Sequence, residues 1–166
     1  AGVNNIPVDA MSERGIPVFN APGANANAVK ELVLAGMLLA ARNIPQALRF
    51  ARSLEGDDDA VHEAVESGKK QFTGRELPGK TLGVIGLGAI GVKVANDALA
   101  LGMNVIGFDP KITVARAWQL HAGVEEAMSI EDLLGRSDYV TFHVPLTDET
   151  REMLTEQRLQ KAKEGI

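Results

Sequence analysis

The stretch from Thr81 to Asp109 constrains the fold of this chain more than any other part of the sequence. It contains a short apolar run, the glycine turn Gly86-Leu-Gly88-Ala-Ile-Gly91, an amphipathic segment of helix length, a second apolar run and a final acid. This order predicts a strand, a helix and a second strand, with the acid about twenty residues after the turn, which is the context that a dinucleotide-binding glycine motif requires.

Each part of the motif has a physical role toward such a ligand. Gly86 allows a tight turn after the strand, Gly88 leaves room for a pyrophosphate to approach the backbone, and Gly91 lets the helix pack closely on the strand. The helix N-terminus offers free N–H groups to the phosphates. Asp109, at the tip of the second strand, can accept both ribose hydroxyls and would repel the 2′-phosphate of NADP, so the motif favours NAD. The alternative is a plain strand–helix turn without a ligand, and Lys111 is interpreted as a solvated lysine rather than a phosphate ligand.

Composition narrows the class of protein. The 45% hydrophobic content and 17 glycines in 166 residues suit an α/β domain with a real core. The net charge of −5 is spread along the chain and argues against nucleic acid as the main partner. The absence of cysteine excludes disulfides and thiolate metal sites and is compatible with a cytoplasmic location, which we predict. No apolar run approaches the length of a membrane span, so we predict no membrane partner.

The first part of the chain is too small to bury a core. Residues 7–14 suggest a short helix, 16–20 a strand and 21–25 a loop. We therefore assign residues 1–21 to the end of a preceding domain and residues 22–166 to the dinucleotide-binding domain. The chain begins without Met and ends on Gly165-Ile166, where another strand is expected to start, so we expect a fragment.

A long helix is predicted from Ala26 to Arg42, and its middle is apolar nearly all round. A surface helix carries a single apolar stripe, so this one requires cover on more than one side. A core helix and a subunit interface both remain open. Pro45 is expected to interrupt the helix before a second one over 46–54. The acid run Asp57-Asp58-Asp59 is interpreted as a solvated loop or helix start rather than a metal site.

Strands and helices alternate after Asp109, which predicts a parallel sheet with right-handed crossovers. The predicted elements are a helix over 113–121, a strand over 124–128, a helix over 130–136 capped by Ser129, a strand over 139–144 and helical pieces over 148–162.

His143-Val-Pro-Leu-Thr147 should lie at the carboxyl end of a strand, where ligands of such sheets bind. His143 could be considered as a general base because its pKa is near neutral. No carboxylate follows it closely in sequence to orient it, so a structural or cofactor-lining role is favoured.

Several motifs together resemble one family. They are Ala1-Gly-Val-Asn-Asn-Ile6, Gly15-Ile-Pro-Val-Phe-Asn-Ala-Pro-Gly23, Leu77-Pro-Gly-Lys-Thr-Leu-Gly-Val-Ile-Gly-Leu-Gly-Ala-Ile-Gly91, Gly107-Phe-Asp-Pro110 and His143-Val-Pro-Leu-Thr147. In this order they resemble the D-isomer-specific 2-hydroxyacid dehydrogenases, and most closely the branch of D-3-phosphoglycerate dehydrogenases. Glyoxylate, hydroxypyruvate or lactate dehydrogenases are the alternative, and an NAD(H)-sensing corepressor of the same fold is a third.

The resemblance implies an α/β protein: a Rossmann doubly wound parallel sheet with a small remnant of a second, substrate-binding domain, and NAD held between the two. It implies a homodimer formed through the helix near residues 26–42, and a small 2-hydroxy acid as substrate. Ala1, Gly2 and Val3 match the loop that faces the substrate carboxylate. The cofactor positions that carry over are Gly86, Gly88, Ala89, Ile90, Gly91, Asp109, His143, Val144, Pro145 and Thr150.

The family reaction moves a hydride between C2 of the substrate and nicotinamide. It uses an arginine to hold the substrate carboxylate, a histidine as acid/base and a glutamate that orients the histidine. The resemblance places all three after Ile166, and Arg136, Arg151 and Arg158 do not match the arginine motif. We therefore predict cofactor binding by these 166 residues and assign them no catalytic residue.

Overall fold

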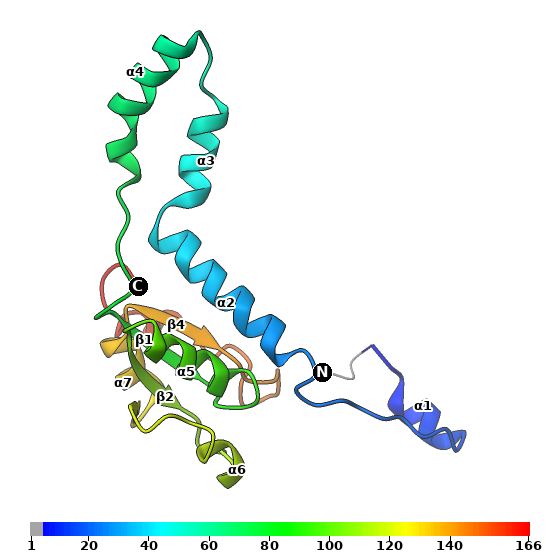
Figure 1. Ribbon diagram of the computed structural model, residues 1–166. Helices are drawn as coiled ribbons and strands as arrows, with labels where there is room; N and C mark the ends of the chain where they lie inside the picture. Colours follow the sequence, from blue (N-terminus) through cyan, green and yellow to red (C-terminus); the bar gives the residue numbers. More distant parts are fainter. Residues whose placement is uncertain (1–4) are drawn as a thin grey trace.

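A sheet of four parallel strands forms the centre of the protein in a computed structural model, which describes residues 5–166 (Figure 1). The strands are β1 (Thr81–Ile85), β2 (Asn104–Phe108), β3 (Val124–Glu126) and β4 (Tyr139–Phe142), in the spatial order β3-β2-β1-β4. The chain thus moves outward from β1 through β2 to β3 and then returns to place β4 on the other side of β1. A crevice forms at such a reversal of strand order.

Helices cover both faces of this sheet, as the doubly wound arrangement predicts. Helix α5 (Gly91–Ala100) lies on one face and α7 (Ile130–Arg136) on the other. The alternation along β1 explains the two cores: Leu82 and Val84 pack with α5, while Ile85 packs with α7. Because both faces are covered, the central strands β1 and β2 are mostly apolar runs, whereas the edge strand β3 carries two exposed glutamates.

The start of α7 shows how local sequence sets an element boundary. The Ser129 hydroxyl accepts a hydrogen bond from the Asp132 N–H at 3.1 Å, as the predicted cap requires. The Asp132 carboxylate in turn accepts the N–H of Met128 at 3.0 Å, one residue before the position that a reciprocal capping box would use. The predicted helix therefore begins and ends at the expected residues.

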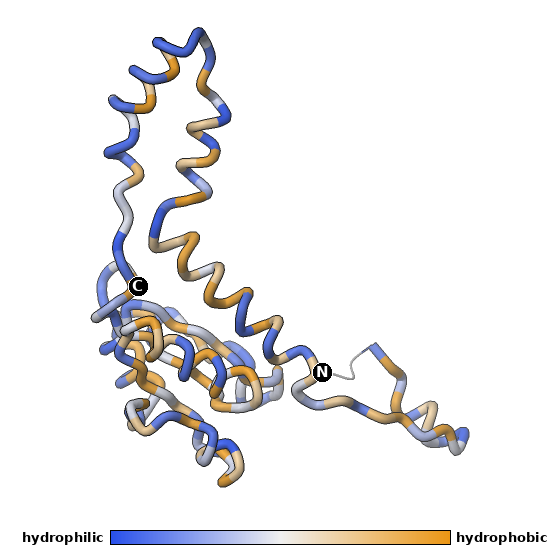
Figure 2. The backbone as a smooth tube through the Cα atoms, in the orientation of Figure 1, coloured by the Kyte–Doolittle hydropathy of each residue, from blue (hydrophilic) through white to orange (hydrophobic). Residues whose placement is uncertain are grey.

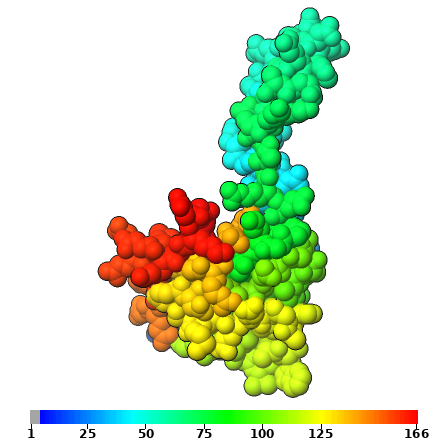
Figure 3. Space-filling model, turned by 90° about the vertical axis from the view of Figure 1, so that its left-hand side faces the viewer, coloured from blue at the N-terminus to red at the C-terminus, as the bar shows by residue number. Residues whose placement is uncertain are grey.

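A helical arm extends away from the sheet (Figures 1 and 3). It consists of α2 (Ala26–Ala41), α3 (Ile44–Arg52), α4 (Asp58–Gly68) and the 3₁₀ turn η1 (Lys69–Phe72). Lys30 of α2 pairs with Asp97 of α5 at 2.7 Å and ties the base of the arm to the sheet domain. Farther out, the rings of Phe50 and Phe72 lie 5.1 Å apart and join α3 to η1.

Two expectations for the arm need comment. Helix α2 ends at Ala41, and the break lies at Asn43, which has φ 53°; Pro45 instead lies in the first turn of α3, where its missing N–H costs nothing. Asp57 caps α4 by accepting the Ala60 N–H at 3.0 Å, so the acid run is a helix start, and no group of potential metal ligands occurs within residues 5–166.

The apolar helix α2 is only partly covered. Met37 and Ala41 are buried in the core beneath α2, whereas Leu32, Leu38 and Leu39 are 73%, 42% and 41% exposed. Figure 2 shows the apolar positions running along α2 where it leaves the sheet domain. The second layer of cover that the sequence requires is therefore not supplied by residues 5–166.

Several predicted elements are wrong. Residues 16–20 form no strand, because no sheet edge lies beside them and Pro17 has no N–H to donate. Residues 148–162 contain mostly turns and the short helix α8 (Glu156–Leu159), with Glu152 in the left-handed region at φ 53°. The strand expected to start at Ile166 stays a prediction, because the described residues end there.

The remaining elements agree with the sequence apart from their length. A short helix, α1 (Val8–Glu13), occurs where one was predicted and lies away from the sheet domain (Figure 1). Helix α6 (Val114–Ala117) covers less than the predicted range 113–121. Within residues 5–166, no helix is long and apolar enough to span a membrane. Ala1, Gly2 and Val3 lie outside the described residues.

Candidate dinucleotide-binding site

The candidate site is built at the edge where three strands end together. Ile85 of β1 stands opposite Phe108 of β2 and Phe142 of β4. The ladder continues one residue further: the Gly86 N–H donates to the Phe108 carbonyl at 2.9 Å, and the His143 N–H donates to the Ile85 carbonyl at 2.7 Å. The glycine turn, the acid after β2 and the histidine after β4 therefore meet at one edge, on both sides of the crevice.

The three glycines differ in what a side chain would meet. Gly86 has φ +92°, and a Cβ there would lie 2.9 Å from the His143 carbonyl oxygen, so glycine is required for the turn. A Cβ at Gly91 would lie 1.9 Å from the Gly86 carbonyl oxygen, because the helix starts against the strand end. At Gly88 nothing lies within 4 Å. These are the turn, the close packing and the open approach that the motif predicts.

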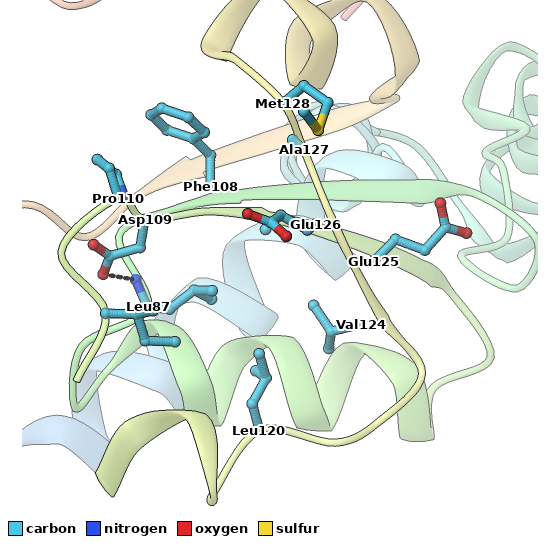
Figure 4. A pocket seen from close by; sticks show the side chains of 12 residues that line it. Leu87, Phe108, Asp109, Pro110, Leu120, Val124, Glu125, Glu126, Ala127 and Met128 are labelled. Carbon is cyan, nitrogen blue, oxygen red and sulfur yellow. Dashed lines mark hydrogen bonds between the residues drawn. The ribbon is translucent and has the colours of Figure 1, made fainter. Parts of the chain in front are cut away.

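Asp109 is held by the backbone of both neighbouring loops. Its Oδ2 accepts the Leu87 N–H at 2.8 Å, a bond drawn in Figure 4, and its Oδ1 accepts the Lys111 N–H at 2.9 Å. Each carboxylate oxygen has a second lone pair, so both can still accept a hydroxyl. The acid is thus preorganised as a double acceptor before a ligand arrives.

The start of α5 leaves backbone donors free. The N–H groups of Gly88, Ala89 and Ile90 donate to no acceptor among residues 5–166, while the next turn bonds back normally, with the Val92 N–H on the Gly88 carbonyl at 3.1 Å. Such N–H groups at a helix start bind phosphate oxygens. The backbone from 88 to 90 therefore fits the pyrophosphate of a dinucleotide.

A cavity of about 700 Å³ occupies the crevice, which is within the range of small-molecule sites. It is lined by Ile85, Gly86, Gly88, Phe108, Asp109, Pro110, Lys111, His143, Val144, Pro145, Thr147, Asp148, Glu149, Thr150 and Met153. The sequence-predicted positions are thus brought together, except that Ala89, Ile90 and Gly91 do not line the cavity and form the helix start beside it. Contact of each residue with the cofactor stays a prediction.

His143 is half-buried at the cavity wall. Its Nε2 lies 3.0 Å from the Thr141 hydroxyl, and burial lowers the pKa of the imidazole below its usual value. The ring is therefore neutral near pH 7. No carboxylate of residues 5–166 bonds to it, so the geometry agrees with a lining role rather than that of an oriented base.

The turn after β4 is fixed by a threonine. The Thr150 hydroxyl donates to the Pro145 carbonyl at 2.5 Å and accepts the Thr147 N–H at 2.7 Å. These bonds hold residues 145–150 as one turn along the cavity wall. Thr150, predicted as a cofactor ligand, therefore also shapes the segment that carries Asp148 and Glu149.

One feature of the rim was missed from the sequence. Lys111, after β2, forms an ion pair with Glu149, after β4, and this pair lowers the pKa of the Glu149 carboxyl. The two residues are 38 positions apart, and only the parallel alignment of β1, β2 and β4 brings them together. The lysine interpreted as solvated is therefore partnered.

A second cavity of about 400 Å³ lies on the other side of Asp109 (Figure 4). Its walls come from the glycine turn, the end of β2, β3 and the segments on either side of β3, with Leu87, Leu120 and Met128 among the lining side chains. It is not lined by Gly86, Gly88 or the residues after β4. The cavity at the strand-order reversal is therefore the better candidate for a dinucleotide.

Comparison with known proteins agrees with this geometry. The family model described as "D-isomer specific 2-hydroxyacid dehydrogenase, NAD binding domain" matches residues 34–166. A D-3-phosphoglycerate dehydrogenase of Methanocaldococcus jannaschii is 45% identical over 164 residues, covering 99% of this chain and 29% of the relative. A hydroxypyruvate reductase of Thermotoga maritima is 38% identical, covering 99% of this chain and 48% of the relative.

The fold also matches a solved structure. The apo structure of D-lactate dehydrogenase from Escherichia coli superposes with a TM-score of 0.79 at 31% sequence identity, covering 100% of this chain and 48% of that protein. The parallel sheet with its glycine turn and acid defines an NAD-binding domain, and the predicted cofactor is NAD. The chain belongs to the family of D-isomer-specific 2-hydroxyacid dehydrogenases. It spans 29% of the length of the phosphoglycerate dehydrogenase relative and 48% of the hydroxypyruvate reductase relative.

Proposed function

We propose that the full-length protein is an NAD-dependent oxidoreductase that transfers a hydride between 3-phosphoglycerate and NAD, the reaction that leads into serine biosynthesis. The observation that carries the proposal is the 45% identity to a D-3-phosphoglycerate dehydrogenase over nearly the whole chain. A reductase of hydroxypyruvate is the second candidate, because a relative of that name is 38% identical over the same length.

In this proposal the residues of the chain bind and orient the cofactor, which supplies the hydride acceptor when bound. The free N–H groups of residues 88–90 hold the pyrophosphate, and Asp109 accepts the ribose hydroxyls. Val144 and Pro145 form the apolar wall, with neutral His143 beside them. The residues that hold the substrate and move its proton are proposed to lie outside residues 5–166.

The domain assignment is part of the same proposal. Residues 1–21 would belong to the substrate-binding domain, and Ala1, Gly2 and Val3 would meet the substrate carboxylate through backbone N–H groups. Residues 22–166 would form the cofactor domain. We also place the protein in the cytoplasm, a location that cell fractionation with an antibody against the full-length protein would test.

Substrate oxidation by the full-length protein tests the proposed activity. We expect NADH to form from NAD and 3-phosphoglycerate, with much lower rates for D-lactate and for reduction of hydroxypyruvate. A preference for hydroxypyruvate would favour the second candidate. NADH binding without oxidation of any 2-hydroxy acid would favour the sensing corepressor instead.

An Asp109→Ala variant tests the cofactor site separately from the substrate. Loss of a charged acceptor for a ribose hydroxyl should weaken NADH binding by about tenfold to a hundredfold. Asp109→Asn serves as the matched control, because an amide oxygen can still accept the Leu87 N–H and hold the glycine turn. Undiminished NADH affinity in the alanine variant would refute the assigned ribose contact.

We further propose that α2 forms part of a homodimer interface. The support is its exposed leucines: Leu32 is 73% exposed in the middle of a helix whose other face is buried. Leu32→Lys should shift the protein toward monomer in analytical ultracentrifugation. Val114→Lys, at a 75% exposed position on α6, is the control and should leave the oligomeric state unchanged. A dimer unaffected by Leu32→Lys would exclude this face.

A further inference from the structure

The rim of the 700 Å³ cavity carries an ion pair that joins its two sides. Lys111 lies two residues after Asp109, and Glu149 lies in the turn that Thr150 holds after β4. Both residues line the cavity, and both side chains are well exposed, at 75% and 73%. An exposed ion pair contributes little to the stability of the fold, so this pair acts mainly on the charge that the cavity rim presents to a ligand.

Lys111 is the cation best placed to meet a charge on the ribose. Its backbone N–H bonds to the same Asp109 carboxylate that is assigned to the ribose hydroxyls, at 2.9 Å. A free lysine at this position would be a point-charge ligand for a 2′-phosphate and would oppose the repulsion from Asp109. Pairing with Glu149 weakens that attraction, because the carboxylate offsets part of the ammonium charge at the rim.

The nearby cation Arg151 is also paired with an acid. Arg151 pairs with Asp148 at 3.7 Å, so the segment that supplies Glu149 also supplies an acid for the arginine beside it. Lys111, which lines the cavity, and Arg151, which does not, are thus each matched by an acid from consecutive positions of one turn. This arrangement leaves Asp109 as the charge that decides which ribose is accepted.

We propose that Glu149 is a positioning residue that sets the preference for NAD over NADP by pairing with Lys111 at the cavity rim. The inference rests on the proposed cofactor site, in which Asp109 faces the ribose. Discrimination then has two parts: repulsion of the 2′-phosphate by Asp109, and withdrawal of the lysine that would otherwise attract it.

The test is the ratio of the Kd for NADPH to the Kd for NADH, measured by fluorescence titration of the full-length protein. Glu149→Gln frees Lys111 and should lower that ratio by about fivefold, the effect of an exposed ion pair with a phosphate, with the NADH affinity nearly unchanged. Lys111→Gln alone should raise the ratio, because it leaves the Glu149 carboxylate unpaired at the rim, where it repels the 2′-phosphate. The double variant should return to the original ratio.

The control is Glu152→Gln, which removes one negative charge three residues further along and should not change the ratio, since Glu152 forms no ion pair within residues 5–166. An unchanged ratio in Glu149→Gln would overturn the proposal. So would a gain for NADPH that persists in the double variant, because removal of the acid alone would then explain it. Equal weakening of the binding of both cofactors would also overturn it, because the ion pair would then hold the two sides of the cavity together without discriminating between the cofactors. The Asp109→Ala test measures the Kd for NADH alone, so its failure would overturn the proposed cofactor site and is distinguishable from a failure of the Glu149 proposal.

Discussion

Alanine at Gly88 and at Gly91 should have opposite consequences, although the two positions lie three residues apart in one motif. A Cβ at Gly91 would lie 1.9 Å from the Gly86 carbonyl oxygen, about 1.1 Å closer than the 3.0 Å below which real Cβ contacts essentially do not occur. The position of this Cβ is fixed by the backbone of residue 91, and the atom that it meets is a backbone carbonyl oxygen, so no side-chain rotation can relieve the contact. At Gly88 the same methyl group would meet nothing within 4 Å, and its φ lies outside the left-handed region.

The magnitudes follow from these distances. Overpacking of this kind costs about 3 kcal/mol, and for a domain of this size that lowers the Tm by about 6–12 °C. Gly88→Ala should leave the Tm unchanged or raise it slightly, since it removes about 0.4–1 kcal/mol of unfolded-state entropy. Its methyl group would instead stand where the pyrophosphate approaches, and loss of one phosphate hydrogen bond should weaken NADH binding about tenfold to a hundredfold.

Thermal denaturation and NADH titration of the two variants separate the effects. We expect Gly91→Ala to lose stability and Gly88→Ala to lose cofactor affinity at full stability. A Gly91→Ala protein with the original Tm would refute the close-packing role. A Gly88→Ala protein that binds NADH as before would refute the pyrophosphate approach, whatever its stability.

Three further outcomes follow from local geometry. Ser129→Ala removes the cap of α7 and should lower the free energy of unfolding by about 1 kcal/mol in urea denaturation, whereas Ser129→Asp, which can still cap, should lose much less. Ser137→Ala deletes a buried hydroxyl that donates to the Leu133 carbonyl at 2.6 Å and should also cost about 1 kcal/mol; no loss of stability would show that this bond is replaced. Burial lowers the pKa of His143 from 6.5, so below that value the unfolded chain binds more protons than the folded one and stability falls as the pH drops. Between about pH 7 and pH 5, before the carboxylates titrate, the Tm of His143→Gln should therefore fall less steeply with decreasing pH than the Tm of the unchanged protein. Parallel profiles of Tm against pH would contradict the burial of a neutral ring.

The elements that the sequence predicted well are those with a strong local cause. The apolar runs of β1 and β2, the glycine turn and the Ser129 cap each depend on residues within a few positions of one another. Their boundaries therefore follow from the sequence. Residues 16–20 have the composition of a strand and form none, since a strand needs a neighbour and no sheet edge is near them. Residues 148–162 lose most of their predicted helix because threonine side chains bond the backbone in turns instead.

In the candidate site, too, the features with a local cause were predicted from the sequence and those that depend on the alignment of strand ends were not. The sequence predicted the glycines, Asp109 and the segment from His143 to Thr147, because the order of strand, turn, helix and acid reflects one ligand. It could not predict that Asp109 is held by the Leu87 N–H, or that burial keeps His143 neutral. These depend on how the strand ends align, which no single segment encodes.

By itself, the sequence indicated the family, the alternation of strands and helices from Thr81 to Phe142 and the glycine turn and acid that are predicted to bind a dinucleotide, because these are properties of residues close together along the chain. Only the tertiary structure decided that residues 38 positions apart, Lys111 and Glu149, close the rim of the cavity as an ion pair. It also decided that part of the apolar surface of α2 is left uncovered by residues 5–166. Both depend on the parallel sheet that brings β1, β2 and β4 to a common end and directs the helical arm away from it.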